Sequence, residues 1–187
     1  MADHASAQLR HVDPDRDAAA CAAIFAPHVA ASAVSFEQDV PDAARFAERI
    51  ATATRTHPWL VLERDGRVIA YASASSHRPR AAYRWAAEVG IYVDPAHRRG
   101  GAGRRLYGAL FDLLRRQRLQ IACAGITLPN DASIGLHRAL GFEPAGVQRA
   151  IGYKNGAWHD VSWWQLRLTP GEDGAPREPL GPQRLPG

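Results

Sequence analysis

The chain has 187 residues, a formal net charge of +4 and a hydrophobic fraction of 46%, which suits one domain with a sizeable core. This composition excludes an intrinsically disordered chain, and no apolar run approaches the roughly 18 residues that suggest a membrane-spanning helix. The mildly basic charge favours acidic ligands without indicating nucleic acid. The start of the sequence lacks the apolar core of a signal peptide. Cys21 and Cys123 lie far apart in apolar segments, so we expect free thiols and a cytoplasmic location.

The first half of the sequence alternates apolar strands with alanine-rich helices. Two helices are expected, over residues 15–31 and 42–53, and the first begins with acidic residues in its first turn. Asp65 and Gly66 form a pair that is typical of tight hairpin turns. The apolar strands of this half are expected over residues 9–12, 59–64, 67–74 and 82–93.

The second half contains the clearest amphipathic helix. From Gly103 to about Arg118, leucine and alanine recur at the spacing of one buried helix face. The apolar run 121–126 predicts a strand that is covered on both faces. A short helix follows and ends at Gly141. Two last strands are expected near 144–153 and 158–168, on either side of an Asn-Gly turn.

The composition changes after Leu168. Residues 169–187 are rich in proline and glycine, so we expect a disordered tail there and a single domain over residues 1–168. The order of elements predicts a mixed α/β fold built on one sheet.

An arginine- and glycine-rich stretch, AHRRGGAGRRL (96–106), lies between a predicted strand and a predicted helix. Free N–H groups and the dipole at a helix N-terminus bind anions, and glycines let phosphate approach the backbone. A P-loop would have lysine where Arg104 stands, and a dinucleotide fingerprint would have glycine where Leu106 stands. The pattern Arg-x-x-Gly-x-Gly that begins at Arg98 instead resembles the pyrophosphate loop of the GNAT superfamily of acyl-CoA-dependent N-acetyltransferases. A plain strand-to-helix turn with solvated arginines is the alternative.

A second motif supports the same superfamily. LPNDASIGLHRALGF (128–142) resembles its asparagine followed by a short helix that ends in leucine, glycine and an aromatic residue. His137 stands where many members have tyrosine, which indicates a subgroup. Together with HPWLV, AYRWAAEVGIYVDPAHRRGGAG and GYKNGAWHDVSWWQL, the motifs resemble the phosphinothricin N-acetyltransferases from about residue 8 to 168. Relatives in this subgroup acetylate methionine sulfoximine or methionine sulfone.

The resemblance implies a GNAT fold, a mixed and mostly antiparallel central sheet of about seven strands flanked by helices. It also implies a homodimer, for which Trp158, Trp163 and Trp164 offer apolar area, although burial in the core is an equal alternative. The histidines show no metal-ligand spacing, so no metal is expected.

Acetyl-CoA is the implied co-substrate. Its pyrophosphate is expected over the amides of the glycine-arginine loop, and its amide-rich arm beside the end of the long strand, as an added strand would lie. The residues expected to bind it are Ile91, Tyr92, Val93, Arg99, Gly100, Gly101, Ala102, Gly103, Arg104, Asn130 and Ser133.

Two residues are candidates for the chemistry. An amino acid's α-amine is largely protonated at pH 7, so the reaction needs a base. Glu88 interrupts an apolar strand, and the resemblance assigns a glutamate there the role of base. His137 is the candidate proton donor to the leaving thiolate. The alternatives are a solvated carboxylate and a packed histidine.

The expected acceptor is a small amino-acid analogue with acidic groups, which arginines bind through bidentate hydrogen bonds. Val89 and Gly90 depart from the small hydroxyl residues of the best-known members, which leaves the best substrate open. The residues expected to line the acceptor site are Phe36, Arg78, Arg80, Tyr83, Val89 and Gly90.

Three other functions fit the sequence less well. An RNA-binding module would have stacking aromatics among the basic residues, and residues 94–106 contain none, so no nucleic acid or membrane partner is expected. A non-catalytic acyl-CoA-binding regulator stays an alternative, against which Glu88 and His137 argue. An acetyltransferase for protein N-termini or polyamines favours an acidic specificity loop, whereas residues 77–84 are basic.

Overall fold

The computed structural model describes residues 7–169 and 175–185, which form a seven-stranded sheet in the order β1-β2-β3-β4-β5-β7-β6. Only β4 and β5 pair in parallel, and the other neighbours are antiparallel. This confirms the mixed, mostly antiparallel sheet predicted from the sequence. The strands are β1 (Gln8–His11), β2 (Trp59–Arg64), β3 (Arg67–Ser76), β4 (Ala86–Val93), β5 (Ile121–Thr127), β6 (Glu143–Lys154) and β7 (Ala157–Arg167).

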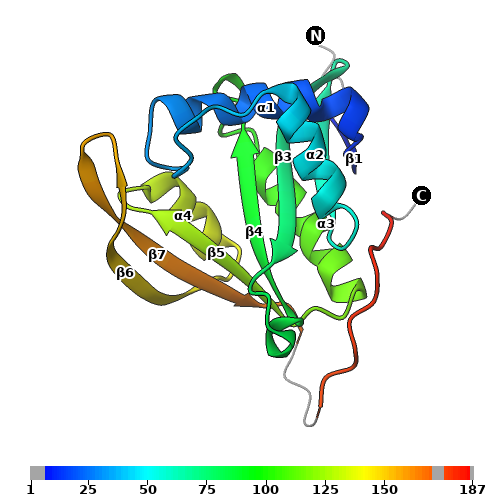
Figure 1. Cartoon of the computed structure of the whole chain (residues 1–187). Coiled ribbons are helices and arrows are strands. Elements are labelled where there is room, and N and C mark those ends of the chain that lie inside the picture. The colour runs from blue at the N-terminus through cyan, green and yellow to red at the C-terminus, as the bar shows by residue number, and fades with distance from the viewer. Residues whose placement is uncertain (1–6, 170–174, 186–187) are drawn as a thin grey trace.

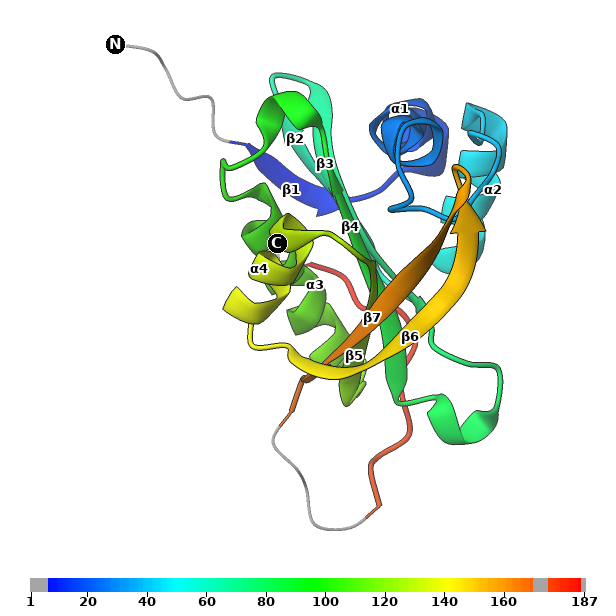
Figure 2. The same cartoon turned by 90° about the vertical axis from the view of Figure 1, so that its left-hand side faces the viewer.

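Helices cover both faces of this sheet. The helices α1 and α2 lie on one face, whereas α3 and α4 lie on the other (Figures 1 and 2). The predicted stripe of α3 is buried against the sheet, with Leu106, Leu110 and Leu114 completely inaccessible. Each such side chain contributes about 1.5–3 kcal/mol to folding. The helices are α1 (Pro14–Ala30), α2 (Ala43–Ala53), α3 (Ala102–Arg116) and α4 (Asp131–Ala139).

The alternation of side chains along β4 separates the two faces. Ala87 and Val89 belong to the core on the α3 side. Glu88 lines a cavity that α1 and α2 border, and Tyr92 packs in the aromatic cluster on that face. The charged side chain of Glu88 therefore faces a cavity and not the core of the protein.

The strands β4 and β5 separate soon after they meet. Their parallel pairing covers only Ala86–Glu88 against Ile121–Cys123, although β4 continues to Val93 and β5 to Thr127. Figure 1 shows the two strands diverging. Within the described residues, the backbone of β4 beyond Glu88 has no sheet partner on this side, so its N–H and C=O groups can pair with a ligand.

Two predicted strands differ from the observed ones. The strand expected from residue 82 begins at Ala86, because Ala81–Tyr83 forms a 3₁₀ turn. The strand β5 is not covered on both faces, since Gly125 is exposed and Cys123 is half-buried. An apolar run of small residues thus occurs in a strand with one partly open face.

The end of the described chain packs against the domain. Residues 175–185 form no helix or strand, but Glu178 pairs with Arg84 at 2.6 Å and Leu180 N–H donates to the carbonyl of Gln117 at 2.9 Å. This arrangement differs from the disordered tail expected from the composition. The same expectation for residues 170–174 and 186–187, and the domain assignment for residues 1–6, lie outside the described residues.

The hairpin formed by β6 and β7 extends beyond the sheet to the loop after α1 (Figure 2). It turns at Asn155 and Gly156, as predicted, and both have positive φ. Lys154, the only lysine in the sequence, is 4% exposed. Its Nζ donates to the carbonyls of Val29 at 2.6 Å and Ser35 at 2.7 Å. One buried ammonium thus joins the hairpin to α1 and to the loop after it.

Candidate active site

A cavity of about 330 Å³ opens on the α1–α2 face of the sheet, above β3 and β4. Its walls are aromatic, with Phe25, Phe46 and Tyr92 among them. Such a cavity combines apolar walls with a few convergent polar groups, as ligand sites do. The polar residues that line it are Ser35, Glu37, Arg49, Ser73, Ser75 and Glu88.

Glu88 is the carboxylate of this cavity that lies on the sheet. It faces Ser75 across the β3–β4 pair, and its side chain is 39% exposed. One carboxylate oxygen, Oε1, lies 3.0 Å from His77 Nδ1. Because the side chain is open to the cavity and hydrogen-bonded on one side, it has the geometry of a general base.

An arginine and a second carboxylate complete the cavity. Arg49 of α2 forms an ion pair with Glu37 at 3.0 Å. Its guanidinium lies over the rings of Phe25 and Phe46, 5.5 Å and 5.1 Å from their centroids. Cation–π contacts of this kind hold a guanidinium in place. Arg49 is not among the site residues expected from the sequence; the available signal was an arginine three positions after the buried Phe46 on a short helix.

The predicted acceptor residues divide into two groups. Gly90 and Val89 line the cavity, although the Val89 side chain packs in the core on the opposite face. Arg78, Arg80 and Tyr83 are exposed in the loop between β3 and β4, and the structure does not bring them into the cavity.

Phe36 also lies outside the cavity lining. A Cβ built at position 152 would overlap the Phe36 ring, so this ring lies directly on the glycine of β6. The neighbouring residues Ser35 and Glu37 do line the cavity. Phe36 therefore fixes the loop that carries them.

The glycine-arginine loop leads into an open helix terminus. Gly101 is the N-cap of α3 with a φ of 78°, and no side chain caps it in the described chain. The first N–H groups of α3 therefore lack helical partners and are available to bind an anion. Gly101 is required for the left-handed turn. Gly103 has a different role, because a Cβ there would lie 3.0 Å from Leu136 Cδ2 of α4.

Of the other residues expected to bind acetyl-CoA, Ile91, Tyr92 and Val93 lie on the unpaired part of β4, and Asn130 and Ser133 lie at the start of α4. Ile91 and Val93 pack against the α3-side core, so their backbone rather than their side chains is available to a ligand. Asn130 caps α4 by accepting from Ser133 N at 3.1 Å. The unpaired strand edge and the uncapped helix N-terminus match an amide-rich arm and a pyrophosphate, so these residues fit acetyl-CoA. Arg99, Gly100 and Arg104 are exposed around this terminus, where Ala102 is buried.

His137 is part of the core between α3 and α4. It is 3% exposed, its Nδ1 donates to Ser133 O at 2.8 Å, and Tyr107 OH lies 3.2 Å from Nε2. Burial lowers its pKa, which the Ser133 hydrogen bond only partly offsets. Because Nδ1 donates to a carbonyl, Nε2 accepts from Tyr107, and both ring nitrogens are occupied. This geometry favours a packing role over proton donation to a thiolate.

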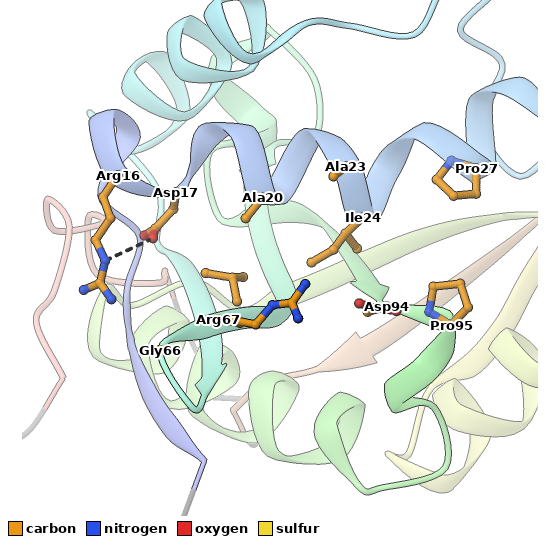
Figure 3. A pocket seen from close by; sticks show the side chains of 11 residues that line it. Arg16, Asp17, Ala20, Ala23, Ile24, Pro27, Gly66, Arg67, Asp94 and Pro95 are labelled. Atoms are coloured by element: carbon orange, nitrogen blue, oxygen red, sulfur yellow. Dashed lines mark ion pairs between the residues drawn. The ribbon is translucent and has the colours of Figure 1, made fainter.

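A larger cavity, about 590 Å³, lies between α1, the β2–β3 turn and the end of β4 (Figure 3). Arg16, Arg67, Asp17 and Asp94 contribute charges of both signs. Asp17 is already paired with Arg10 at 2.6 Å. The candidate base lies in the other cavity, so the smaller space is the candidate active site.

Neither cysteine is an activated nucleophile. Burial raises the pKa of Cys21 to about 12, and it also raises the pKa of Cys123.

In residues 7–169 and 175–185, no group of three or more potential metal ligands is found. No helix there has both the length and the apolar character needed to span a membrane.

Comparisons with known proteins identify the family. The acetyltransferase (GNAT) domain family matches residues 12–163. The phosphinothricin N-acetyltransferase of Streptomyces viridochromogenes is 37% identical over 166 residues, 89% of each chain. The L-methionine sulfoximine/L-methionine sulfone acetyltransferase of Salmonella typhimurium is 40% identical over 112 residues, 60% of this chain and 66% of the relative. A phosphinothricin acetyltransferase from Sinorhizobium meliloti, crystallised with AcCoA, has a TM-score of 0.86 at 34% identity, covering 92% of this chain and 94% of its own.

The chain therefore belongs to the GNAT family of acetyltransferases. It is an acetyl-CoA-dependent N-acetyltransferase, and the resemblance drawn from its motifs is confirmed.

Proposed function

We propose that the enzyme acetylates the α-amine of a small amino-acid analogue with an acidic or strongly polar side chain, of the class of phosphinothricin, methionine sulfoximine and methionine sulfone. The observation that carries this proposal is the cavity in which a candidate base and an arginine both lie, Glu88 on the sheet and Arg49 on α2. The names of the two relatives described above support the substrate class. Small size follows from the volume of about 330 Å³.

The reaction begins with removal of a proton from the acceptor's ammonium group. Glu88 accepts this proton, directly or through a water molecule, and the neutral amine attacks the thioester carbonyl. A C–N bond forms and the C–S bond breaks. The nitrogen then loses its second proton, the departing thiolate of coenzyme A takes up one proton, and one net proton is released to solvent. Unpaired N–H groups of β4 polarise the carbonyl. The raised thiol pKa of Cys21 and of Cys123 argues against a covalent acetyl-cysteine route.

Arg49 is the residue we assign to the acidic end of the acceptor. Its ion pair with Glu37 and its contacts with Phe25 and Phe46 hold the guanidinium in the cavity, and a guanidinium has enough N–H donors to bind a second anion. Arg78, Arg80 and Tyr83 lie in the exposed loop, and their contact with the acceptor stays a prediction.

Steady-state kinetics with phosphinothricin, methionine sulfoximine and methionine sulfone test the base and the arginine separately. Glu88→Gln should lower kcat by about 10² or more at neutral pH, with partial recovery at high pH where the amine is already neutral. Wild-type kcat across that range would exclude Glu88 as the base.

Arg49→Gln should raise the acceptor KM by about 10- to 100-fold, because a hydrogen bond to a charged group contributes about 1.5–3 kcal/mol. The KM for acetyl-CoA should stay unchanged. Arg45→Gln is the matched control, since Arg45 is exposed one turn earlier on α2. Equal effects of the two substitutions would remove Arg49 from the acceptor site.

A homodimer and a cytoplasmic location belong to the same proposal. Apolar side chains on the β6–β7 hairpin support the dimer, since Trp158 is 64% exposed and Val147, Ile151 and Tyr153 are also exposed. Trp164 is buried in the core, which removes it from the predicted interface. Sedimentation at micromolar concentration should give a dimer that Trp158→Arg dissociates, and a wild-type monomer would refute the proposed dimer.

The two free thiols support the proposed cytoplasmic location, which cell fractionation tests.

A further inference from the structure

His77 is the first residue after β3, and its imidazole contacts the carboxylate of Glu88. The distance from Nδ1 to Oε1 is 3.0 Å. In the β3–β4 register Ser75 lies opposite Glu88, so His77, two positions further along, is the diagonal neighbour of Glu88. Diagonal neighbours across antiparallel strands are within reach of long side chains. The pairing of the two strands thus creates this contact between residues eleven positions apart.

Two aromatic rings hold the imidazole in place. Tyr83 and Trp163 both meet it edge to face, with ring centroids 5.8 Å away. Trp163 is itself held by a hydrogen bond from its Nε1 to Gln148 Oε1 at 2.8 Å. The His77 side chain is only 15% exposed, compared with 39% for Glu88. The imidazole is therefore the rigid member of the pair and the carboxylate is the more exposed one.

We propose that His77 is a positioning residue for the acetyl transfer, which holds Glu88 in the orientation that accepts the amine proton. An ionised carboxylate can only accept hydrogen bonds, so Nδ1–H donates to Oε1 and the other carboxylate oxygen stays free for the proton. Ordering a glutamate side chain costs rotamer entropy. Tyr83 and Trp163 hold His77, and His77 holds the Glu88 side chain in one rotamer in the folded protein, before substrate binds.

Packing alone does not account for a histidine at this position. A phenyl ring would make the same edge contacts with Tyr83 and Trp163, and only the Nδ1 atom contacts Glu88. The inference rests on the proposed role of Glu88 as the base. The contact with His77 explains why the Glu88 carboxylate keeps one orientation on an open strand face.

Two substitutions at position 77 separate the hydrogen bond from the packing. His77→Phe keeps a ring between the two aromatics and removes the donor, so we expect kcat to fall about 10-fold while the KM for acetyl-CoA is unchanged. His77→Asn places an amide N–H close to the position of Nδ1, and it should recover most of the lost kcat. Wild-type kcat in the Phe variant, or equal losses in both variants, would overturn the proposal.

A double-mutant cycle with Glu88→Gln tests whether His77 acts through the base. In the Glu88→Gln background, His77→Phe should have no further effect on kcat, because the group that it positions is gone. Losses that multiply independently would overturn the proposal. If Glu88→Gln alone keeps the wild-type rate, the base assignment fails and this inference falls with it. If Glu88→Gln is inactive and His77→Phe is fully active, only the inference fails.

His11→Phe is the matched control. The His11 imidazole is half-buried and, among the described residues, has one hydrogen bond, from Leu185 N at 3.0 Å. It lies on β1 at one edge of the sheet. We expect its kcat to equal that of the wild type. Thermal unfolding of each variant shows whether a lost rate reflects a lost fold.

Discussion

Replacement of Lys154 by methionine tests how the β6–β7 hairpin supports the acceptor cavity. Methionine keeps most of the apolar stem and removes the ammonium group, whose two contacts are the carbonyls of Val29 at 2.6 Å and Ser35 at 2.7 Å. A compact ammonium fits between two carbonyls, whereas the planar guanidinium of the chain's many arginines does not match this geometry.

The expected loss of stability follows from these contacts. Each hydrogen bond to a charged group contributes about 1.5–3 kcal/mol, and the freed carbonyls are buried. Removing a buried charge also returns its desolvation cost, so the net loss should be about 2–4 kcal/mol. At about 2–4 °C per kcal/mol for a chain of this size, Tm should fall by about 4–16 °C.

Urea unfolding at pH 7 and acceptor kinetics are the two measurements. The loop that Lys154 holds carries Ser35 and Glu37, so the acceptor KM should rise while the KM for acetyl-CoA stays unchanged. Arg149→Met on the exposed side of the same strand is the control and should change stability by less than about 0.5 kcal/mol. A Lys154→Met protein as stable as this control would refute the reasoning.

Three further outcomes are expected. Gly101→Val forces a β-branched residue to a φ of 78°, so the KM for acetyl-CoA should rise strongly in an otherwise folded protein; an unchanged KM would exclude the loop as the pyrophosphate site. His137→Phe should lower stability by about 1–3 kcal/mol and leave kcat within a few-fold of wild type, whereas a large loss of kcat at unchanged stability would restore it as the proton donor. Burial lowers the pKa of several histidines below the unfolded value of about 6.5, so the unfolded chain binds more protons and stability falls as pH drops below about 6.5. Urea midpoints at about pH 7.5 and 5.5 check this, and equal midpoints would contradict it. These histidines are His11, His28, His57 and His137.

Local sequence determined the elements and two of the ligand-binding features. The apolar stripe of α3 and the Asp-Gly and Asn-Gly turns specify their own structure, because helix periodicity and positive φ are properties of neighbouring residues. The glycine-arginine loop was predicted at the start of α3 for the same reason. Glu88 stood out because a carboxylate is unusual in an apolar strand.

Tertiary structure alone decided which side chains share the cavity. Arg49 lies 39 positions before Glu88, and His77 meets the same carboxylate only through the β3–β4 register. Lys154 reaches Val29 across 125 positions. His137 was assigned to chemistry from a motif, but the packing of α4 on α3 buries its ring beside Tyr107. Contacts of this range depend on which strands pair and which faces meet, and no local pattern in the chain encodes them.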